Sequence, residues 1–419
     1  MSNLKVLKGN IAYSASEQEI KYYADSHIVL EDGIVLGIYE ELPESFAGAE
    51  ISDYGSSLII PGFVDLHVHA SQFYQRGLGM DMELIEWLEK YTFPQEKQFS
   101  DLSYAREVYS RFVDEIVRQG TLAACIYATV HKPATELLFE ILSEKGICAF
   151  VGKVNMDRNC PDGLREERSA SIKETEELIE KYGSHPAVRP ILTPRFVPSC
   201  SSELLEALGK LAQKYNIPIQ SHLSENYGEI KWVGRLHADH PNYASVYHRK
   251  GLFGHTPTLM AHCVHLTEEE MEMMRTHQVI AVHCPESNSN LASGVMPVGR
   301  MLDRGIKVGL GSDVGGGHNI SMPRTIVRTL QLSNVLKSLD AANRPLTFEE
   351  AFYMATKGGG SFFGKLGSFE EGYRFDALVL DDTALGGMEL SLKERLQRFV
   401  YIGDDRNISV RFAGGKEIK

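Results

Sequence analysis

The 419-residue sequence lacks several features that mark secreted, membrane-spanning and nucleic-acid-binding proteins. It has only six cysteines and no C-x-x-C pair, which argues against a disulfide framework. No apolar run is long enough to span a bilayer, and the opening MSNLKVLKGN lacks the apolar stretch of a signal peptide. We therefore expect a cytoplasmic protein that does not bind membranes. The formal net charge of −13 argues against a nucleic-acid polymer as partner, because such binding needs basic surface.

Several common catalytic motifs are also missing. The sequence contains no phosphate-binding loop, no nucleophile elbow and no glycine-rich dinucleotide fingerprint after its first long apolar strand. It also lacks the H-x-E and P-C-x-x-C signature of enzymes that edit bases in polynucleotides. These absences exclude several reaction classes and direct attention to the histidines.

A regular alternation of strand and helix patterns fills the middle of the chain. Apolar, β-branched runs alternate with charged helical stretches, and the run of 202–215 shows a serine cap followed by leucines at helical spacing. The expected strands are 58–69, 120–129, 146–155, 187–196, 217–225, 259–264, 279–285 and 306–313. The expected helices include 97–118, 168–182, 202–215, 267–276 and 322–339. Eight such units predict an α/β fold, a (β/α)8 barrel of the TIM type, with an open doubly wound sheet as the alternative.

Both ends of the chain differ from this middle region, because they consist of short strand patterns and turns. The segment 27–41 reads as a hairpin with Asp32-Gly33 at its turn. We predict three segments: 1–60 and 371–419 form one small β domain together, and 61–370 forms the barrel.

Polar residues recur where the predicted barrel strands end. His67 and His69 lie two apart on one strand, so their side chains point the same way. Later strand ends carry Arg195, His222, Glu225, His262, His265, His283 and Asp313. Each residue alone has an ordinary structural explanation, such as a helix start or a turn. Together they predict one site, because active sites of such barrels lie at the carboxyl ends of the strands.

The chemistry of this set indicates a metal-dependent hydrolase. Histidine nitrogens and a carboxylate suit zinc or iron better than calcium or magnesium. A metal held with an open position lowers the pKa of bound water and provides hydroxide near neutral pH. Glu225 lies three residues beyond His222 and is placed to move protons, while Asp313 would orient the hydroxide. We expect hydrolytic attack on a carbon that bears a leaving group.

At these residues the chain resembles the amidohydrolase superfamily. The order H-x-H, His, His, Asp is similar to that of its deaminase branch, in which a barrel binds one metal and both termini form a small β-sandwich. Arg195 ends the fourth strand, where binuclear relatives carry a lysine. The resemblance implies one divalent transition metal per chain, zinc or alternatively iron, held by His67, His69, His222 and Asp313, with His262 either a ligand or the group that orients the water.

Longer motifs resemble the guanine deaminase family within this superfamily. They are PGFVDLHVHASQF, LIEWLEKYTFPQE, GKVNMDRN, LTPRFVPSCS, QSHLSEN, HCPESNSNLASG and GLGSDVGGG, which span about 61–317. The resemblance implies hydrolysis of guanine to xanthine and ammonia by a homodimer. It assigns catalytic proton transfer to Glu225 and Asp313, with His262 at the water. It assigns contacts with guanine to Gln72, Arg195, Phe196 and Glu225.

Two alternatives remain open from the sequence. One keeps the site and changes the substrate to a triazine, a pterin or another purine or pyrimidine. The other is a non-catalytic scaffold on the same barrel, which the full complement of expected ligand types argues against. Turnover of competing amino-heterocycles and metal analysis distinguish these possibilities.

Overall fold

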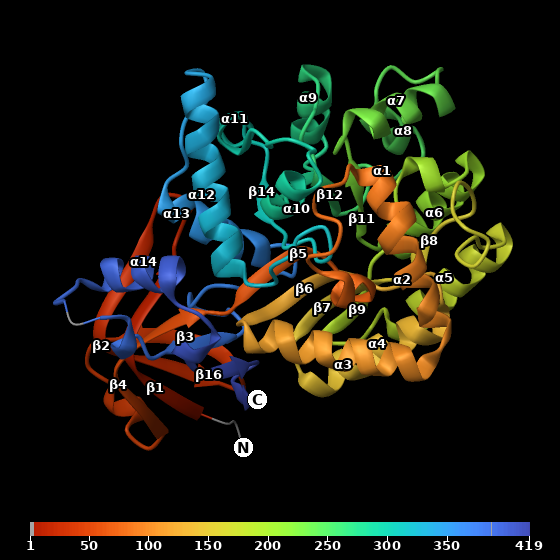
Figure 1. Cartoon of the computed structure of the whole chain (residues 1–419). Coiled ribbons are helices and arrows are strands. Elements are labelled where there is room, and N and C mark those ends of the chain that lie inside the picture. The colour runs from red at the N-terminus through yellow and green to blue at the C-terminus, as the bar shows by residue number, and fades with distance from the viewer. Residues whose placement is uncertain (1–3, 387) are drawn as a thin grey trace.

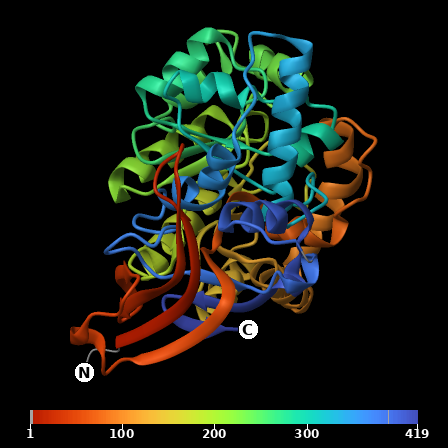
Figure 2. The same ribbon diagram turned by 90° about the vertical axis from the view of Figure 1, so that its left-hand side faces the viewer.

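Strands from both chain ends form a single seven-stranded sheet. The computed structural model describes residues 4–386 and 388–419. The sheet order is β17-β16-β15-β4-β1-β2-β3, so the ends meet where β15 pairs with β4. The bounds are β1 (Leu4–Ser14), β2 (Ile20–Glu31), β3 (Ile34–Tyr39), β4 (Glu50–Pro61), β15 (Ala377–Leu380), β16 (Ile408–Ala413) and β17 (Lys416–Ile418). Figures 1 and 2 show this sheet projecting from one side of the helical body, with both termini near it.

The expected hairpin at Asp32-Gly33 is confirmed. Strands β2 and β3 are antiparallel, and both turn residues have positive φ, 50° at Asp32 and 79° at Gly33. A side chain at Gly33 would also collide with the backbone of the β16–β17 turn, because a Cβ there would lie 2.2 Å from the carbonyl oxygen of Gly414. The turn between β2 and β3 therefore packs closely against the turn between β16 and β17.

The middle of the chain provides two four-stranded parallel sheets and a short two-stranded ladder. The orders are β5-β6-β7-β9, β11-β12-β13-β14 and β10-β8. The bounds are β5 (Phe63–His69), β6 (Thr121–Tyr127), β7 (Cys148–Gly152), β8 (Val154–Asn155), β9 (Val188–Pro190), β10 (Thr193–Pro194), β11 (Ile219–Leu223), β12 (Thr258–His262), β13 (Ile280–His283) and β14 (Val308–Leu310). Every predicted strand region is present. The run 58–69 is divided, because its first part joins the terminal sheet as β4.

Backbone contacts join the outer strands of these two sheets on both sides. After β14, the amide of Asp313 donates to the carbonyl of His67 (2.8 Å), and the amide of His69 donates to that of Val314 (2.8 Å). A parallel bridge pairs Leu192 with Ile219 at the other junction. The candidate site residues at the strand ends are therefore held around one centre.

Helices cover the outer faces of the parallel sheets (Figure 1). Their bounds are α1 (Leu84–Trp87), α2 (Phe93–Lys97), α3 (Leu102–Arg118), α4 (Lys132–Lys145), α5 (Arg168–Tyr182), α6 (Ser202–Tyr215), α7 (Tyr227–Leu236), α8 (Tyr243–Arg249), α9 (Glu268–Thr276), α10 (Pro285–Asn290), α11 (Val298–Asp303), α12 (Met322–Leu339), α13 (Phe348–Tyr353) and α14 (Leu392–Ile402). Short 3-10 turns are η1 (Glu44–Phe46), η2 (Ala70–Gln75), η4 (Gln98–Ser100), η5 (Val197–Ser199), η7 (Thr383–Leu385) and η8 (Asp405–Asn407), and π turns are η3 (Leu88–Thr92) and η6 (Met354–Gly358).

The predicted helix ends are mostly confirmed. Helices α5, α6 and α12 have the expected bounds, and α9 begins one residue late because Thr267 is its cap. The expected start at 97 was wrong. Helix α3 begins at Leu102, since the Asp101 side chain accepts hydrogen bonds from the next amides and caps the helix.

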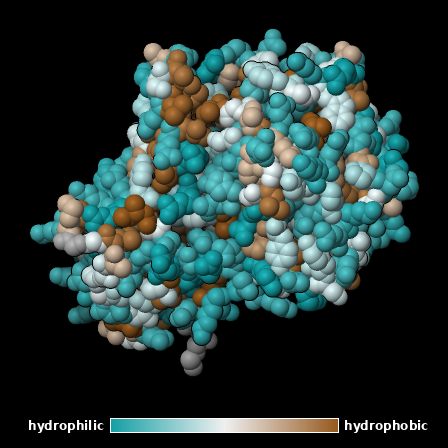
Figure 3. Space-filling model, viewed as in Figure 1, coloured by the Kyte–Doolittle hydropathy of each residue, from teal (hydrophilic) through white to brown (hydrophobic). Residues whose placement is uncertain are grey.

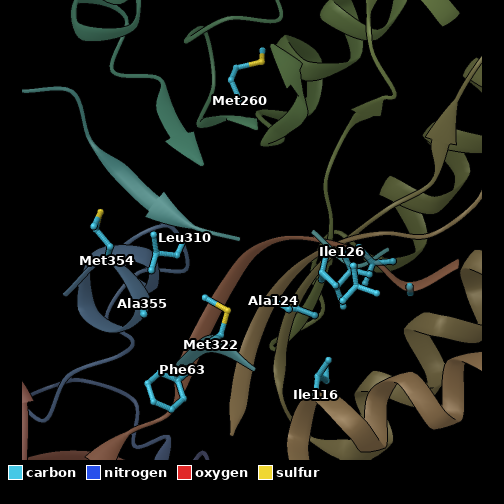
Figure 4. Packing of buried hydrophobic residues seen from close by; sticks show 14 of the residues in the cluster. Phe63, Ile116, Ala124, Ile126, Met260, Leu310, Met322, Met354 and Ala355 are labelled. Carbon is cyan, nitrogen blue, oxygen red and sulfur yellow. The ribbon is translucent and has the colours of Figure 1, made fainter. Parts of the chain in front are cut away.

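One large apolar core lies between the parallel strands and their helices. Figure 4 shows part of it, with Ile116 of α3 near Ala124 and Ile126 of β6. A second cluster lies on the inner side of the strands and includes Val64, Leu66, Val282 and Cys284. In Figure 3 the visible surface is mainly hydrophilic, with small separate apolar areas. Among the described residues, no helix is both long and apolar enough to cross a lipid bilayer.

Candidate active site

The first strand of the parallel region brings His67 and His69 together with Asp313. The two Nε2 atoms lie 3.3 Å apart, and they lie 3.1 Å and 3.3 Å from the same Asp313 oxygen, Oδ1. The pairing of β5 with β6 shifts register between Asp65 and Val68, so this strand is irregular at the histidines. Both side chains nevertheless point to one centre, as the sequence predicts.

His222 and His262 complete the cluster from β11 and β12. The His67 ring lies 4.8 Å from the His222 ring and 5.4 Å from the His262 ring. His222 Nδ1 donates to the carbonyl of Arg195 (2.6 Å), and His262 Nδ1 donates to the amide oxygen of Asn288 (2.8 Å). Because an acceptor holds Nδ1 protonated in both rings, each ring turns its Nε2 atom toward the cluster, where it can act as a ligand when the ring is neutral.

These donors fit a divalent transition metal. The ligand atoms of His67, His69 and His222 lie within 4.8 Å of one another, and His67, His262, Cys284 and Asp313 form an overlapping group. His262 Nε2 is buried without a hydrogen-bond partner. A buried ring nitrogen without a hydrogen-bond partner, close to other imidazoles and to a carboxylate, fits a site for a zinc-like ion.

The protonation states of His67, His222 and Asp313 also favour metal binding. Burial lowers the pKa of His67 to about 4 and that of His222 well below its usual range, so both imidazoles are neutral. Burial opposes ionisation of Asp313, but His67, His69 and His262 together hold its pKa well below the usual range. Burial raises the pKa of the Cys284 thiol well above its usual range, which leaves it neutral and a poor competitor as ligand.

Backbone strain marks the same strand ends. Ser224, His262, Cys263 and Asp313 all have positive φ, from 47° to 73°. Non-glycine residues rarely adopt this conformation, and functional sites are where such strain collects. Each of these residues follows or ends one of the parallel strands β11, β12 and β14.

A pocket opens beside the cluster. Its polar residues are His69, Gln72, Arg195, His222, Glu225, His262, Ser287 and Asp313, and its apolar residues include Leu84, Trp87, Leu88, Phe196 and Leu291. One wall is thus polar and the other is apolar and partly aromatic. This is the lining that a flat polar heterocycle requires.

Glu225 is the proton-transfer candidate of the pocket. Its side chain is buried, with Oε2 3.4 Å from His262 Nε2 and Oε1 accepting a hydrogen bond from Ser293 (3.2 Å). Burial raises its pKa to about 7. A carboxyl group with such a pKa can accept and return a proton at neutral pH. Glu229 fixes the backbone here by accepting from the amide of Glu225 (3.0 Å).

The structure brings together every site residue that the sequence predicts, apart from two extra histidines. His265 Nε2 donates to the Ser293 carbonyl (2.7 Å), and the ring stacks on Tyr227. His283 is buried beside the cluster, and burial lowers its pKa to about 3. Neither belongs to the groups that place ligand atoms close together around the pocket.

Sequence reasoning missed the residues that hold the site from behind. Asp65 accepts hydrogen bonds from the amides of His67 (3.1 Å) and Ser312 (3.0 Å), and so ties β5 to the segment before Asp313. Glu96 contacts both Gln72 and Arg195. These residues, like Asn288, lie within motifs noted in the sequence, but only their contacts show a role.

Comparisons of the sequence and of the structure with known proteins find related proteins over nearly the whole chain. The model of the Amidohydrolase family matches residues 58–418. A guanine deaminase of Dictyostelium discoideum is 40% identical, over 99% of this chain and 98% of its own length. That of Escherichia coli K12 is 34% identical, over 95% and 92%. The crystal structure of guanine deaminase from C. acetobutylicum with guanine bound in its active site matches with a TM-score of 0.98 and 49% identity, covering 100% of both chains.

Proposed function

Because this chain belongs to the amidohydrolase family, we propose that it hydrolyses guanine to xanthine and ammonia. The observation that carries the proposal is the convergence of buried imidazoles, Asp313 and Glu225 on one pocket that aromatic residues also line. Its relatives that carry the name guanine deaminase are similar over nearly the whole chain. The substrate is a small neutral molecule, in agreement with the acidic net charge.

The proposal includes the architecture that holds the site. The parallel strands form a closed (β/α)8 barrel over 61–370, and 1–60 with 371–419 form a small β-sandwich domain. The hydrogen bonds between β5 and the segment after β14, and the bridge between residues 192 and 219, support closure of the barrel. The seven-stranded sheet shared by both ends supports the second domain.

The proposed metal is one zinc ion per chain, with iron as the alternative. His67, His69, His222 and Asp313 would hold it, and His262 would be a further ligand or a partner of the attacking water. When bound, such an ion supplies Lewis acidity and lowers the pKa of a water molecule. The neutral imidazoles and the ionised Asp313 support this assignment.

The chain's own residues then move two protons. Water adds at C2 of guanine, the bond to the amino group breaks, and ammonia leaves. Glu225 takes a proton from the attacking water and gives it to a ring nitrogen, which makes C2 more electrophilic. Asp313 passes the second proton to the departing amino group. For this role the Glu225 carboxylate must come within hydrogen-bond reach of both the attacking water and the purine ring. Its buried position beside His262, at the centre of the cluster, supports the role.

Binding of the purine is assigned to other residues of the pocket lining. Gln72 and Arg195 hydrogen-bond the polar edge of guanine, Phe196 packs against the ring, and Trp87 contributes to the apolar wall. Such paired donors reject rings that leave them unsatisfied in a buried site. We further propose a homodimer and a cytoplasmic location, the latter supported by six free thiols.

The test is ammonia release from guanine, with xanthine formation followed by absorbance. The expected result is turnover that a chelator removes and that zinc or iron restores. Adenine, cytosine and ammeline serve as competing substrates. If metal-loaded protein leaves guanine unchanged and converts one of these, the assigned substrate is wrong. If it converts none and binds no metal, the scaffold alternative is correct.

A further inference from the structure

A buried carboxylate links the two residues to which purine binding is assigned. Glu96, on α2, is 3% exposed. Its Oε1 accepts a hydrogen bond from Gln72 Nε2 (2.9 Å), and its Oε2 accepts one from Arg195 Nη1 (2.5 Å). Gln72 comes from η2 after the first barrel strand, and Arg195 follows β10, so one side chain joins two distant segments.

The contacts determine how the Gln72 amide is oriented. Its Oε1 accepts a hydrogen bond from the amide of Gly315 (3.2 Å), while its Nε2 donates to Glu96. Turning the amide over would set donor against donor at Gly315 and acceptor against carboxylate at Glu96. Only one orientation therefore satisfies both neighbours, and it leaves the second Nε2 hydrogen for a ligand.

Arg195 is fixed by the same short helix. Besides the bond to Glu96, its guanidinium lies 5.4 Å from the centre of the Phe93 ring, one turn earlier on α2. The η3 turn that leads into α2 is held against η2 by a second buried pair, in which Gln75 Nε2 donates to Thr92 Oγ1 (2.9 Å). The negative charge of Glu96 offsets the positive charge of Arg195. The pair therefore presents N–H donors to the pocket with little net charge.

We propose that Glu96 is a positioning residue that sets the purine specificity of the site. It holds Gln72 and Arg195 so that both present N–H groups to one acceptor edge of the substrate. The 6-oxo oxygen of guanine lies at such an edge, beside the N7 acceptor. This inference rests on the proposed function, since it concerns the same pocket.

The main test variant is Glu96→Gln. An amide has one oxygen and one NH2 group, so it accepts from only one partner and sets a donor against the other. We expect kcat/KM for guanine to fall about 100-fold, as for a misplaced binding group, with metal content unchanged. Glu96→Asp keeps the charge but is one methylene too short to reach both partners, and we expect a loss of about tenfold. Glu89→Gln, on exposed surface of the neighbouring η3 turn, is the matched control and stays within about twofold.

Binding of unreactive analogues separates positioning from general damage to the pocket. Hypoxanthine carries the oxo group and no amino group, and unsubstituted purine carries neither. Glu96→Gln should raise the inhibition constant of hypoxanthine at least about tenfold and change that of purine less than about twofold. Equal changes for both, or full activity of both Glu96 variants, would overturn the inference alone. Wild-type protein that is inactive on guanine would overturn the proposed function and this inference with it.

Discussion

Replacing Glu225 by glutamine removes the proposed proton carrier while leaving its shape. The carboxyl group is buried, and its Oε1 accepts from Ser293, a bond that the glutamine oxygen can keep. Glu225 belongs to none of the groups that place metal ligand atoms together, so metal content should not change. The variant therefore isolates proton transfer from metal binding.

The expected loss is about 1,000-fold in kcat, within the range for a general acid–base group. At 1.36 kcal/mol per tenfold, this raises the barrier by about 4 kcal/mol. Steady-state xanthine formation measures kcat, and elemental analysis measures metal. Glu269→Gln, on the exposed start of α9, is the control and should match wild type within about twofold. A Glu225→Gln enzyme that holds metal and keeps kcat within tenfold would refute the assigned role.

The pH profile provides an independent check of the same residue. Burial raises the pKa of Glu225 to about 7 in the protein without metal, and a nearby cation lowers it because it favours the carboxylate. Since the carboxylate must be ionised to accept a proton, kcat/KM should fall as pH drops through a pKa at or below 7. Glu225→Gln should lack this acid limb, and a limb that persists unchanged would belong to another group.

Three further changes test other parts of the molecule. Arg195→Ala should lower kcat/KM for guanine about 100-fold, because it removes a donor to the substrate. It should also destabilise folding by about 3 kcal/mol, because it leaves Glu96 buried without its partner. An unchanged kcat/KM in steady-state assays would show that the purine binds elsewhere. Chelation should abolish turnover and lower the unfolding midpoint, because the ligand set loses the ion that stabilises it; a midpoint that does not move would contradict this ligand set. Lys153→Met should cost about 3 kcal/mol in denaturant unfolding because it removes the buried cation that pairs with the largely buried Glu166, and adding Glu166→Gln should restore part of it; no loss would show that the pair contributes nothing.

Regular alternation made most of the fold predictable. Helix α6 illustrates this, because its serine cap and leucine spacing define both ends in the sequence alone. The division of the run 58–69 was not predictable from hydropathy, since both halves are apolar. Gly62 marks the division: its amide donates to the carbonyl of Asp376 (3.0 Å), and a Cβ there would lie 2.5 Å from Leu122. Those neighbours come from distant parts of the chain.

Part of the site could likewise be predicted from the sequence, and part of it could not. Residues at strand ends, such as His67 and His262, could be found because strand position fixes where they point. Glu96 could not, because it lies on a short helix outside that pattern, and its role depends on two partners from other segments. The apolar wall from Leu84 to Leu88 also escaped prediction, since apolar residues on a helix usually indicate core packing.

The pairing of β4 with β15 has a consequence for how this protein is made. Residues 58–61 cannot pair with residues 377–380 until the ribosome has synthesised roughly 300 further residues, which takes about 15–60 s. During that interval the nascent chain carries an open strand edge beside the first histidine pair. Damage to the last forty or so residues, far from the pocket, would make that exposure permanent. Loss of these residues should therefore appear in cells as aggregation and poor yield before it appears as altered catalysis.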